Sequence, residues 1–389
     1  MACAGGIIMP ESLACYGFIK YTVNDGFVPC HTRNETGVIS NYIGGMYRMR
    51  EFKGFVHGVD LGGWYSQCDH TKERYDNFIA ESDIEQISKW GLDHFRLPID
   101  YELVEDKDGN YIQEGFERIR KAIDWARKYN LNVVLDLHKT FGYSFDIGYG
   151  ESGFFENEKY QERFYKLWEK LATEFSGYGD ALAFELLNEV TKKEYCENWN
   201  RIAKTCIQRI RAILPDVKIL VGGYYNNSIE ALKDLDPPYD ENIVYNFHCY
   251  DPVIFTHQGA GWVEGMSLDF RIPVDASFAE MAKCMEEQTK NMGTFADPDP
   301  NKKLSPEYFD KAFAEAVAVA EERNVPLYCG EYGVIENATP EDTLKWYEMI
   351  SASFNKYGIG RAAWSYREMN FGITAPELDS VRDRIIKLL

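Results

Sequence analysis

From residue 55 onward, short apolar segments alternate with segments whose apolar residues recur at helical spacing. This alternation is typical of parallel strands joined by crossover helices. It predicts eight strands, at residues 55–61, 94–99, 132–138, 182–189, 218–223, 242–250, 326–332 and 362–366. Eight such units predict an α/β fold of the (β/α)8 TIM-barrel type. A doubly wound open sheet is the alternative, and it is disfavoured because no Gly-rich phosphate-binding motif follows any strand.

One connection is too long for a simple crossover. Residues 251–305 follow the sixth predicted strand, where a few residues would suffice. The segment starts aromatic and Gly-rich and continues with a helical pattern, which predicts a small helical insertion in this βα loop. Such loops lie on the catalytic face of a barrel, so we expect the insertion to shape one wall of a cleft.

The chain before the barrel has no clear periodicity. We interpret residues 1–48 as an N-terminal extension of unclear role, ahead of a barrel domain at 49–389. An appendage, an N-terminal hairpin and a second start at Met49 are all compatible with this stretch. It has no basic region followed by a continuous apolar run, so it does not resemble a signal peptide. This favours a cytoplasmic protein and leaves secretion open.

The composition limits the partners. The net charge of −20 disfavours nucleic acid and anionic membranes. No run of 18 apolar residues predicts a membrane span. Nine cysteines without CxxC spacing favour free thiols over disulfides or structural zinc. We expect a monomer.

Two glutamates close apolar strand segments and give the strongest indication of chemistry. Glu189 ends LAFELLNE at 182–189, and Glu331 lies in PLYCGEY at 326–332. A carboxylate in such a segment is costly unless it is paired or functional. Two carboxylates that face each other across a cleft are the minimal machinery for breaking a glycosidic bond.

Other polar and aromatic residues close the neighbouring strands, where barrels carry their active sites. They are Arg96, His138, Asn188, His248, Tyr250 and Trp364. Each also has a structural interpretation. Arg96 could pair with Asp136 or Asp100, and the histidines and aromatic residues could belong to the core.

With these residues in place, the sequence resembles glycoside hydrolase family 5, a family of retaining barrel hydrolases. LAFELLNEV at 182–190 is similar to the family's acid/base signature, and all eight near-invariant functional positions have counterparts in the right order. GVDLGGW, FTHQGA and WSY resemble segments of compact clostridial-type β-glucanases. The resemblance covers about 55–389, and residues 1–48 have no counterpart in that branch.

The resemblance implies a retaining mechanism with Glu331 as nucleophile and Glu189 as general acid/base. Arg96 and the Tyr250 hydroxyl would keep Glu331 ionised. The charge of Glu331 would raise the pKa of Glu189 and keep a proton on it, and His248 nearby could tune that pKa.

The resemblance also implies the substrate contacts. Asn188 and His138 would bind sugar hydroxyls, and Trp364 would lie beneath the ring as a stacking floor. Trp64 and Trp262, together with Phe255 and His257, could build flanking subsites or pack within loops. The chemistry needs no cofactor and no metal.

The expected function is therefore a retaining endo-β-1,4-glucanase that acts on β-1,4 or mixed-linkage β-glucan, as polysaccharide or oligosaccharide. An exo-β-glucosidase, a β-1,3-glucanase and a β-mannanase remain open within the family. A non-catalytic sugar-binding barrel is disfavoured because both glutamates are present. A metal-dependent hydrolase is disfavoured because the sequence has no HxH or HExxH spacing.

Overall fold

The computed structural model describes residues 49–146, 152–289 and 299–389. Met49–Leu389 form one compact unit. The N-terminal extension predicted at 1–48 lies outside the described residues.

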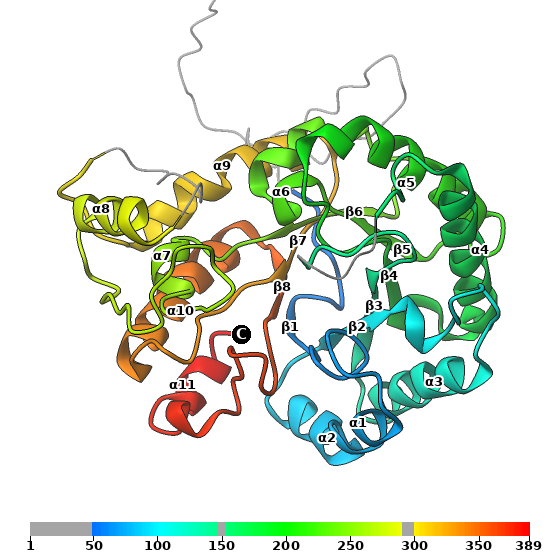
Figure 1. Ribbon diagram of the computed structural model, residues 1–389, viewed down its shortest axis with the longest axis horizontal. Coiled ribbons are helices and arrows are strands. Elements are labelled where there is room, and N and C mark those ends of the chain that lie inside the picture. Colours follow the sequence, from blue (N-terminus) through cyan, green and yellow to red (C-terminus); the bar gives the residue numbers. More distant parts are fainter. Residues whose placement is uncertain (1–48, 147–151, 290–298) are drawn as a thin grey trace, which may run out of the picture. The chain divides into compact units, whose positions relative to one another are not determined.

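Eight parallel strands close into a barrel in chain order (Figure 1). The strands are β1 (His57–Asp60), β2 (His94–Asp100), β3 (Asn132–Lys139), β4 (Leu182–Glu185), β5 (Lys218–Val221), β6 (Ile243–His248), β7 (Leu327–Glu331) and β8 (Gly360–Ala363). β1 pairs with β8, with His57 opposite Arg361, so the ring has no open edge. The predicted TIM barrel is confirmed, and the open-sheet alternative is wrong.

Helices surround the ring of strands (Figure 1). They are α1 (Lys72–Asn77), α2 (Glu81–Lys89), α3 (Gln113–Lys128), α4 (Glu158–Glu174), α5 (Cys196–Arg211), α6 (Tyr224–Asn227), α7 (Val253–Thr256), α8 (Phe278–Gln288), α9 (Pro306–Arg323), α10 (Pro340–Tyr357) and α11 (Arg382–Ile386). The crossover after β5 is the least regular, because the four-residue α6 is followed only by a 3-10 helix, η4 (Ile229–Asp234).

The long helices form where apolar spacing and end signals agree. In α3 the buried residues Phe116, Ile119, Ile123 and Ala126 recur every three or four positions and face the strands. α10 begins after Thr339, whose side chain accepts a hydrogen bond from the Asp342 backbone N–H at 3.2 Å. It ends at Gly358, whose φ of 68° is the left-handed conformation that closes many helices.

The barrel interior changes from apolar to polar along the strands. A separate cluster of apolar side chains forms one layer of the barrel interior. Its members are Phe52, Phe55, Val134, Ala183, Leu220, Val244, Tyr328 and Ala362. Side chains of a strand alternate in direction, so the residue two positions further on faces inward again. On β3, β4 and β6 these next residues are Asp136, Glu185 and Asn246, all fully buried. Polar side chains are thereby gathered toward the carboxyl ends of the strands.

The described part of residues 251–305 holds α7 and α8. Ser277 caps α8 through a reciprocal capping box with Glu280. Phe278 of α8 packs against Tyr308 of α9, with ring centroids 5.4 Å apart, and Figure 1 shows α8 outside the ring of strands. The role of this insertion as a cleft wall stays a prediction.

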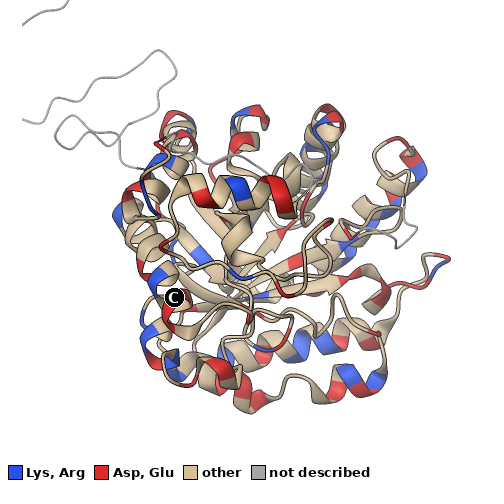
Figure 2. Cartoon of the chain, turned by 60° about the vertical axis from the view of Figure 1, so that its left-hand side comes forward, with Lys and Arg blue, Asp and Glu red and all other residues tan. Residues whose placement is uncertain are grey.

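Basic and acidic residues alternate along the helices around the barrel (Figure 2). Among the described helices, none combines the length and the apolar character needed to cross a lipid bilayer.

Candidate active site

Arg96 of β2 is the centre of the polar layer. Its Nε and Nη2 donate to both carboxylate oxygens of Glu185, at 2.7 and 2.9 Å. Its Nη1 donates to Asp60 at 3.0 Å and to Glu331 at 2.9 Å. Its Nη2 also lies 3.0 Å from Asp136 Oδ2. One fully buried guanidinium is therefore paired with four carboxylates, which come from β1, β3, β4 and β7.

Four buried carboxyl groups share that single cation. Burial raises the pKa of Asp60 and Glu185, and it raises the pKa of Asp136 to about 7, in each case against the charge of Arg96. The same acids raise the pKa of Arg96, although burial opposes them. The prediction offered Asp136 or Asp100 as a structural partner of Arg96, and Asp136 has that position.

Glu331 is the last residue of β7 and is 6% exposed. Arg96 donates to its Oε1 at 2.9 Å, and the Tyr250 hydroxyl donates to its Oε2 at 2.9 Å. Burial raises the pKa of Tyr250, so its hydroxyl keeps its proton and stays a donor. Each oxygen of Glu331 thus accepts a hydrogen bond from one of the two side chains that the sequence analysis placed beside it.

Glu189 lies four positions beyond the end of β4, in a backbone conformation with φ of 35°. The Tyr143 hydroxyl donates to its carbonyl oxygen at 2.6 Å and anchors this turn. Its carboxyl Oε1 lies 2.8 Å from Nδ1 of His248. Burial lowers the pKa of His248 to about 4, so the imidazole is neutral near pH 7.

Burial also raises the pKa of Glu189 to about 7, against an opposing hydrogen bond from Asn226. The sequence prediction attributed this rise to the charge of Glu331, and that cause was wrong. The carboxyl group is withdrawn from water at the mouth of the barrel, and this withdrawal penalises its charged form.

The two glutamates face each other. One oxygen of Glu189, one oxygen of Glu331 and a ring nitrogen of His248 all lie within 4.8 Å of one another. Donors contact both oxygens of Glu331, and burial raises the pKa of Glu189 to about 7. One carboxylate and one carboxylic acid at this separation can attack a carbon and protonate the group that leaves it.

Two side-chain nitrogens in the same layer have no hydrogen-bond partner among the described residues. They are Nε2 of His138 and Nδ2 of Asn188. Nδ1 of His138 is already held by Asp136 at 2.7 Å, and Oδ1 of Asn188 accepts from Arg96 at 2.9 Å. In each side chain, one polar atom is held by a hydrogen bond, and the other is a nitrogen without a partner among the described residues. Such a nitrogen can hydrogen-bond a sugar hydroxyl.

The structure brings Trp364 into this group. It lies one residue beyond β8, and its ring is parallel to His138, with centroids 5.7 Å apart and an interplanar angle of 4°. All eight strand-end residues that the sequence singled out therefore lie in one connected cluster of side chains.

Trp64 is not part of that cluster, and its predicted role in substrate binding is wrong. The side chain is 1% exposed, stacks on Tyr65 at 4.0 Å and donates its indole N–H to the Tyr75 carbonyl at 2.9 Å. Phe255 is likewise buried in the core.

Trp262 is 56% exposed, and its ring centroid lies 6.4 Å from that of His257. Its role in a flanking subsite stays a prediction.

Sequence reasoning missed several residues of the polar layer. Glu185 and Asn246 follow from strand alternation, since each lies two positions beyond an inward apolar residue. Asn246 donates to Glu185 at 2.8 Å and so completes the network around Arg96. Asn226 and Asn227, which follow β5, carried no comparable signal.

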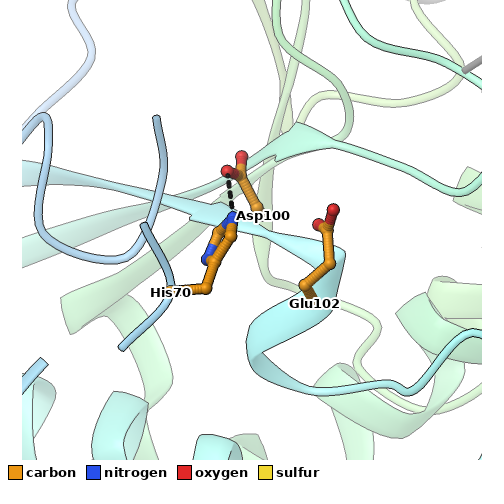
Figure 3. A group of neighbouring side chains, drawn as sticks. All are labelled: His70, Asp100 and Glu102. Atoms are coloured by element: carbon orange, nitrogen blue, oxygen red, sulfur yellow. Dashed lines mark ion pairs between the residues drawn. The ribbon is translucent and has the colours of Figure 1, made fainter. Parts of the chain in front are cut away.

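A second polar cluster consists of His70, Asp100 and Glu102 (Figure 3). His70 Nε2 lies 3.3 Å from Asp100, and Lys139 pairs with Glu102. Burial lowers the pKa of His70, but the hydrogen bonds and charges of Asp100 and Cys68 together outweigh burial and raise the value to about 10. A protonated imidazole beside an ammonium group disfavours a metal cation, so this cluster is an ion-pair network between the loop after β1 and the ends of β2 and β3.

A closed parallel barrel with two facing carboxyl groups at the carboxyl ends of its strands defines a TIM-barrel glycoside hydrolase. The chain belongs to the family described as Cellulase (glycosyl hydrolase family 5), which it matches over residues 53–370.

Two relatives match this chain over most of their own length. It is 44% identical over 342 residues to Cellodextrinase A of Ruminococcus flavefaciens, a match that covers 88% of this chain and 94% of the relative. It is 37% identical to Endoglucanase C of Acetivibrio thermocellus, over 86% of this chain and 98% of the relative. The fold is similar to that of Thermotoga maritima Cel5A solved with cellobiose, at a TM-score of 0.68 and 23% identity, over 87% of this chain and 100% of the other.

Proposed function

We propose that this glycoside hydrolase is a retaining endo-β-1,4-glucanase that cleaves β-1,4 or mixed-linkage β-glucans by double displacement. The observation that carries the proposal is the short distance between the two carboxyl groups. One oxygen of Glu189 lies within 4.8 Å of one oxygen of Glu331. Retaining enzymes hold these groups about 5–5.5 Å apart, whereas inverting enzymes leave about 6.5–9.5 Å for a water molecule. The printed name of the 37% identical relative, Endoglucanase C, supports the substrate class.

In the first step, a Glu331 carboxylate oxygen attacks the anomeric carbon while Glu189 gives its proton to the leaving oxygen. The glycosidic bond breaks, a glycosyl ester forms on Glu331, and the shortened chain leaves as an alcohol. Asn188 and His138 hydrogen-bond sugar hydroxyls, and these bonds strengthen as the ring becomes oxocarbenium-like.

In the second step, Glu189 takes a proton from water, and the resulting hydroxide equivalent attacks the anomeric carbon from the face that the leaving group occupied. The ester bond to Glu331 breaks, and its carboxylate is restored beside Arg96 and Tyr250. Two inversions give a product with the original β configuration.

The pH profile follows from the first step. The free enzyme needs a protonated Glu189, whose pKa is about 7. We expect kcat/KM to fall as the pH rises through about 7, because the acid form is lost. Initial rates on cellopentaose between pH 5 and 9 measure this basic limb. A flat profile from pH 6 to 9 would contradict the assignment of Glu189 as the acid.

Replacing the acid has an effect that depends on the leaving group. We expect Glu189→Ala to lower kcat/KM on barley β-glucan by about 10³-fold, within the range for a lost acid/base. The loss should be far smaller on 2,4-dinitrophenyl β-cellobioside, since that leaving group needs no proton. Added azide should give the β-glycosyl azide by attacking the ester on Glu331. Equal losses on both substrates would argue against the role.

A second candidate function is cleavage of short soluble cello-oligosaccharides in preference to polymer. It is favoured by the 44% identity to a relative named Cellodextrinase A. Both candidates use the same catalytic pair and differ in what occupies the cleft beyond it.

A substrate panel separates the candidates. Barley β-glucan, lichenan, carboxymethylcellulose, mannan, laminarin and cellotriose to cellohexaose are digested, and products are separated by chromatography. Oligomers of several sizes from the first three polymers support the endo-glucanase. Activity confined to cello-oligosaccharides supports the cellodextrinase, glucose alone indicates exo action, and activity mainly on mannan or laminarin overturns the β-1,4-glucan assignment.

A further inference from the structure

The turn after β5, which carries the label α6 (Tyr224–Asn227), has an unusual backbone and is not a regular helix. Tyr225, Asn226 and Asn227 are three consecutive residues with φ of 50°, 57° and 55°. Residues with a Cβ rarely adopt this left-handed region, and asparagine adopts it more readily than most. Such strained segments cluster at functional sites, where surrounding contacts hold them in place.

The first contact of this turn is with Glu189 itself. Asn226 donates from Nδ2 to Glu189 Oε2 at 2.7 Å. The backbone N–H of Asn226 donates to the carbonyl of Val190, the residue after Glu189, at 3.0 Å. The same asparagine therefore holds both the side chain of Glu189 and the backbone beside it.

The second contact runs through His248. Nδ2 of Asn227 lies 3.3 Å from Nε2 of His248, and Nδ1 of the same ring lies 2.8 Å from Glu189 Oε1. Asn227 is fully buried, and a Cβ on Gly222 would lie only 2.2 Å from its Oδ1, so the close approach requires glycine there. The turn thus reaches both oxygens of Glu189, one directly and one through the imidazole.

We propose that Asn226 is a positioning residue that orients the carboxyl group of Glu189 and favours its ionised form. The inference rests on the proposed acid/base role of Glu189. A donated N–H bond stabilises a carboxylate more than a neutral acid, so this contact opposes the effect of burial on Glu189. The hydrogen bond from Asn226 matters most in the second step, because Glu189 must then be ionised to accept a proton from water.

The other groups around Glu189 come from several elements, and a substitution at Asn226 changes the chemistry of none of them. The basic groups are Arg96, His138 and His248. The acidic groups are Asp136, Asp146 and Glu331, and the phenols are Tyr143 and Tyr250. A change in the pH profile of an Asn226 variant is therefore attributable to the lost amide.

The test is the pH dependence of kcat/KM on cellopentaose for Asn226→Gly and Asn226→Asp. Glycine removes the amide and adopts the left-handed backbone without strain. We expect its basic limb to move to higher pH by about 0.5 to 1 unit, because Glu189 loses a donor. Aspartate places a negative charge at the same position, so its limb should move further in the same direction.

Tyr225→Gly is the matched control, because it makes the same backbone change one residue earlier in the turn. Its basic limb should stay at the wild-type position, and thermal midpoints of all three variants report their folding. An unmoved limb in Asn226→Gly, or an equal shift in Tyr225→Gly, overturns the inference. If the wild type has no basic limb, or Glu189→Ala stays active on β-glucan, the proposed function fails instead.

Discussion

Glu331→Ala should lower kcat on barley β-glucan by about 10⁴-fold or more, the scale seen when a nucleophile is removed. Without the carboxylate, no glycosyl ester forms, and water has no activated route to the anomeric carbon. External azide fits the space left by the side chain and should restore part of the rate on 2,4-dinitrophenyl β-cellobioside. A single displacement by azide gives the α-glycosyl azide, which proton NMR distinguishes from the β anomer.

The control for this variant is Glu322→Ala, an exposed glutamate of α9. It should retain wild-type kcat. The thermal midpoint of Glu331→Ala should stay near that of the wild type, because Arg96 keeps Asp60, Asp136 and Glu185 as partners. Wild-type activity in folded Glu331→Ala, or a β-glycosyl azide as its product, would refute Glu331 as nucleophile.

Arg96→Met should produce the largest loss of stability of any single substitution in the polar layer. Removing one partner of a buried ion pair costs about 3–5 kcal/mol, because the remaining charge is buried without compensation. Here Asp60, Asp136 and Glu185 all lose their common cation. Urea unfolding at pH 7.5, followed by tryptophan fluorescence, measures the difference.

The pH dependence makes this prediction specific. Without Arg96, the pKa values of these buried acids rise further above their unfolded values of about 4. The folded state then binds more protons than the unfolded state, so stability falls as the pH rises through those raised values. The deficit of Arg96→Met should therefore be smaller at pH 5 than at pH 7.5.

Arg361→Met is the matched control. Arg361 is also buried but donates to the Leu388 carbonyl, and no carboxylate is paired with it within the described ranges. Its loss should cost less than that of Arg96 and should change little between pH 5 and 7.5. A stability of Arg96→Met within about 1 kcal/mol of the wild type at pH 7.5, well below the cost of an uncompensated charge, would contradict the shared-cation interpretation.

The fold was predictable because each strand is a short apolar segment bounded by polar residues, and helical spacing separates consecutive strands. The chemistry at the strand ends was predictable for a related reason: polar side chains closing apolar segments stand out. Glu189 is the instructive case, since it lies four positions beyond β4 and still joins the site, through a turn anchored by Tyr143.

The errors arose where the outcome depends on packing in three dimensions. Trp64 follows a strand as Trp364 does, but its ring is enclosed by Tyr65 and by Trp125 of α3, which lies 61 positions further along the chain. The cause of the raised pKa of Glu189 depends on how deeply the carboxyl group is buried. Asn226 reaches its partner through a left-handed turn, which leaves no periodic pattern in the sequence.

The sharing of Arg96 among four strands also bears on how the barrel avoids misalignment. A one-residue slip of β4 would turn Glu185 outward and bring Phe184 or Leu186 against the guanidinium. The bidentate acceptor would then be lost and a cation would face hydrocarbon. The native register is therefore the one in which Arg96 has all four of its carboxylate partners, and Glu331 is one of them.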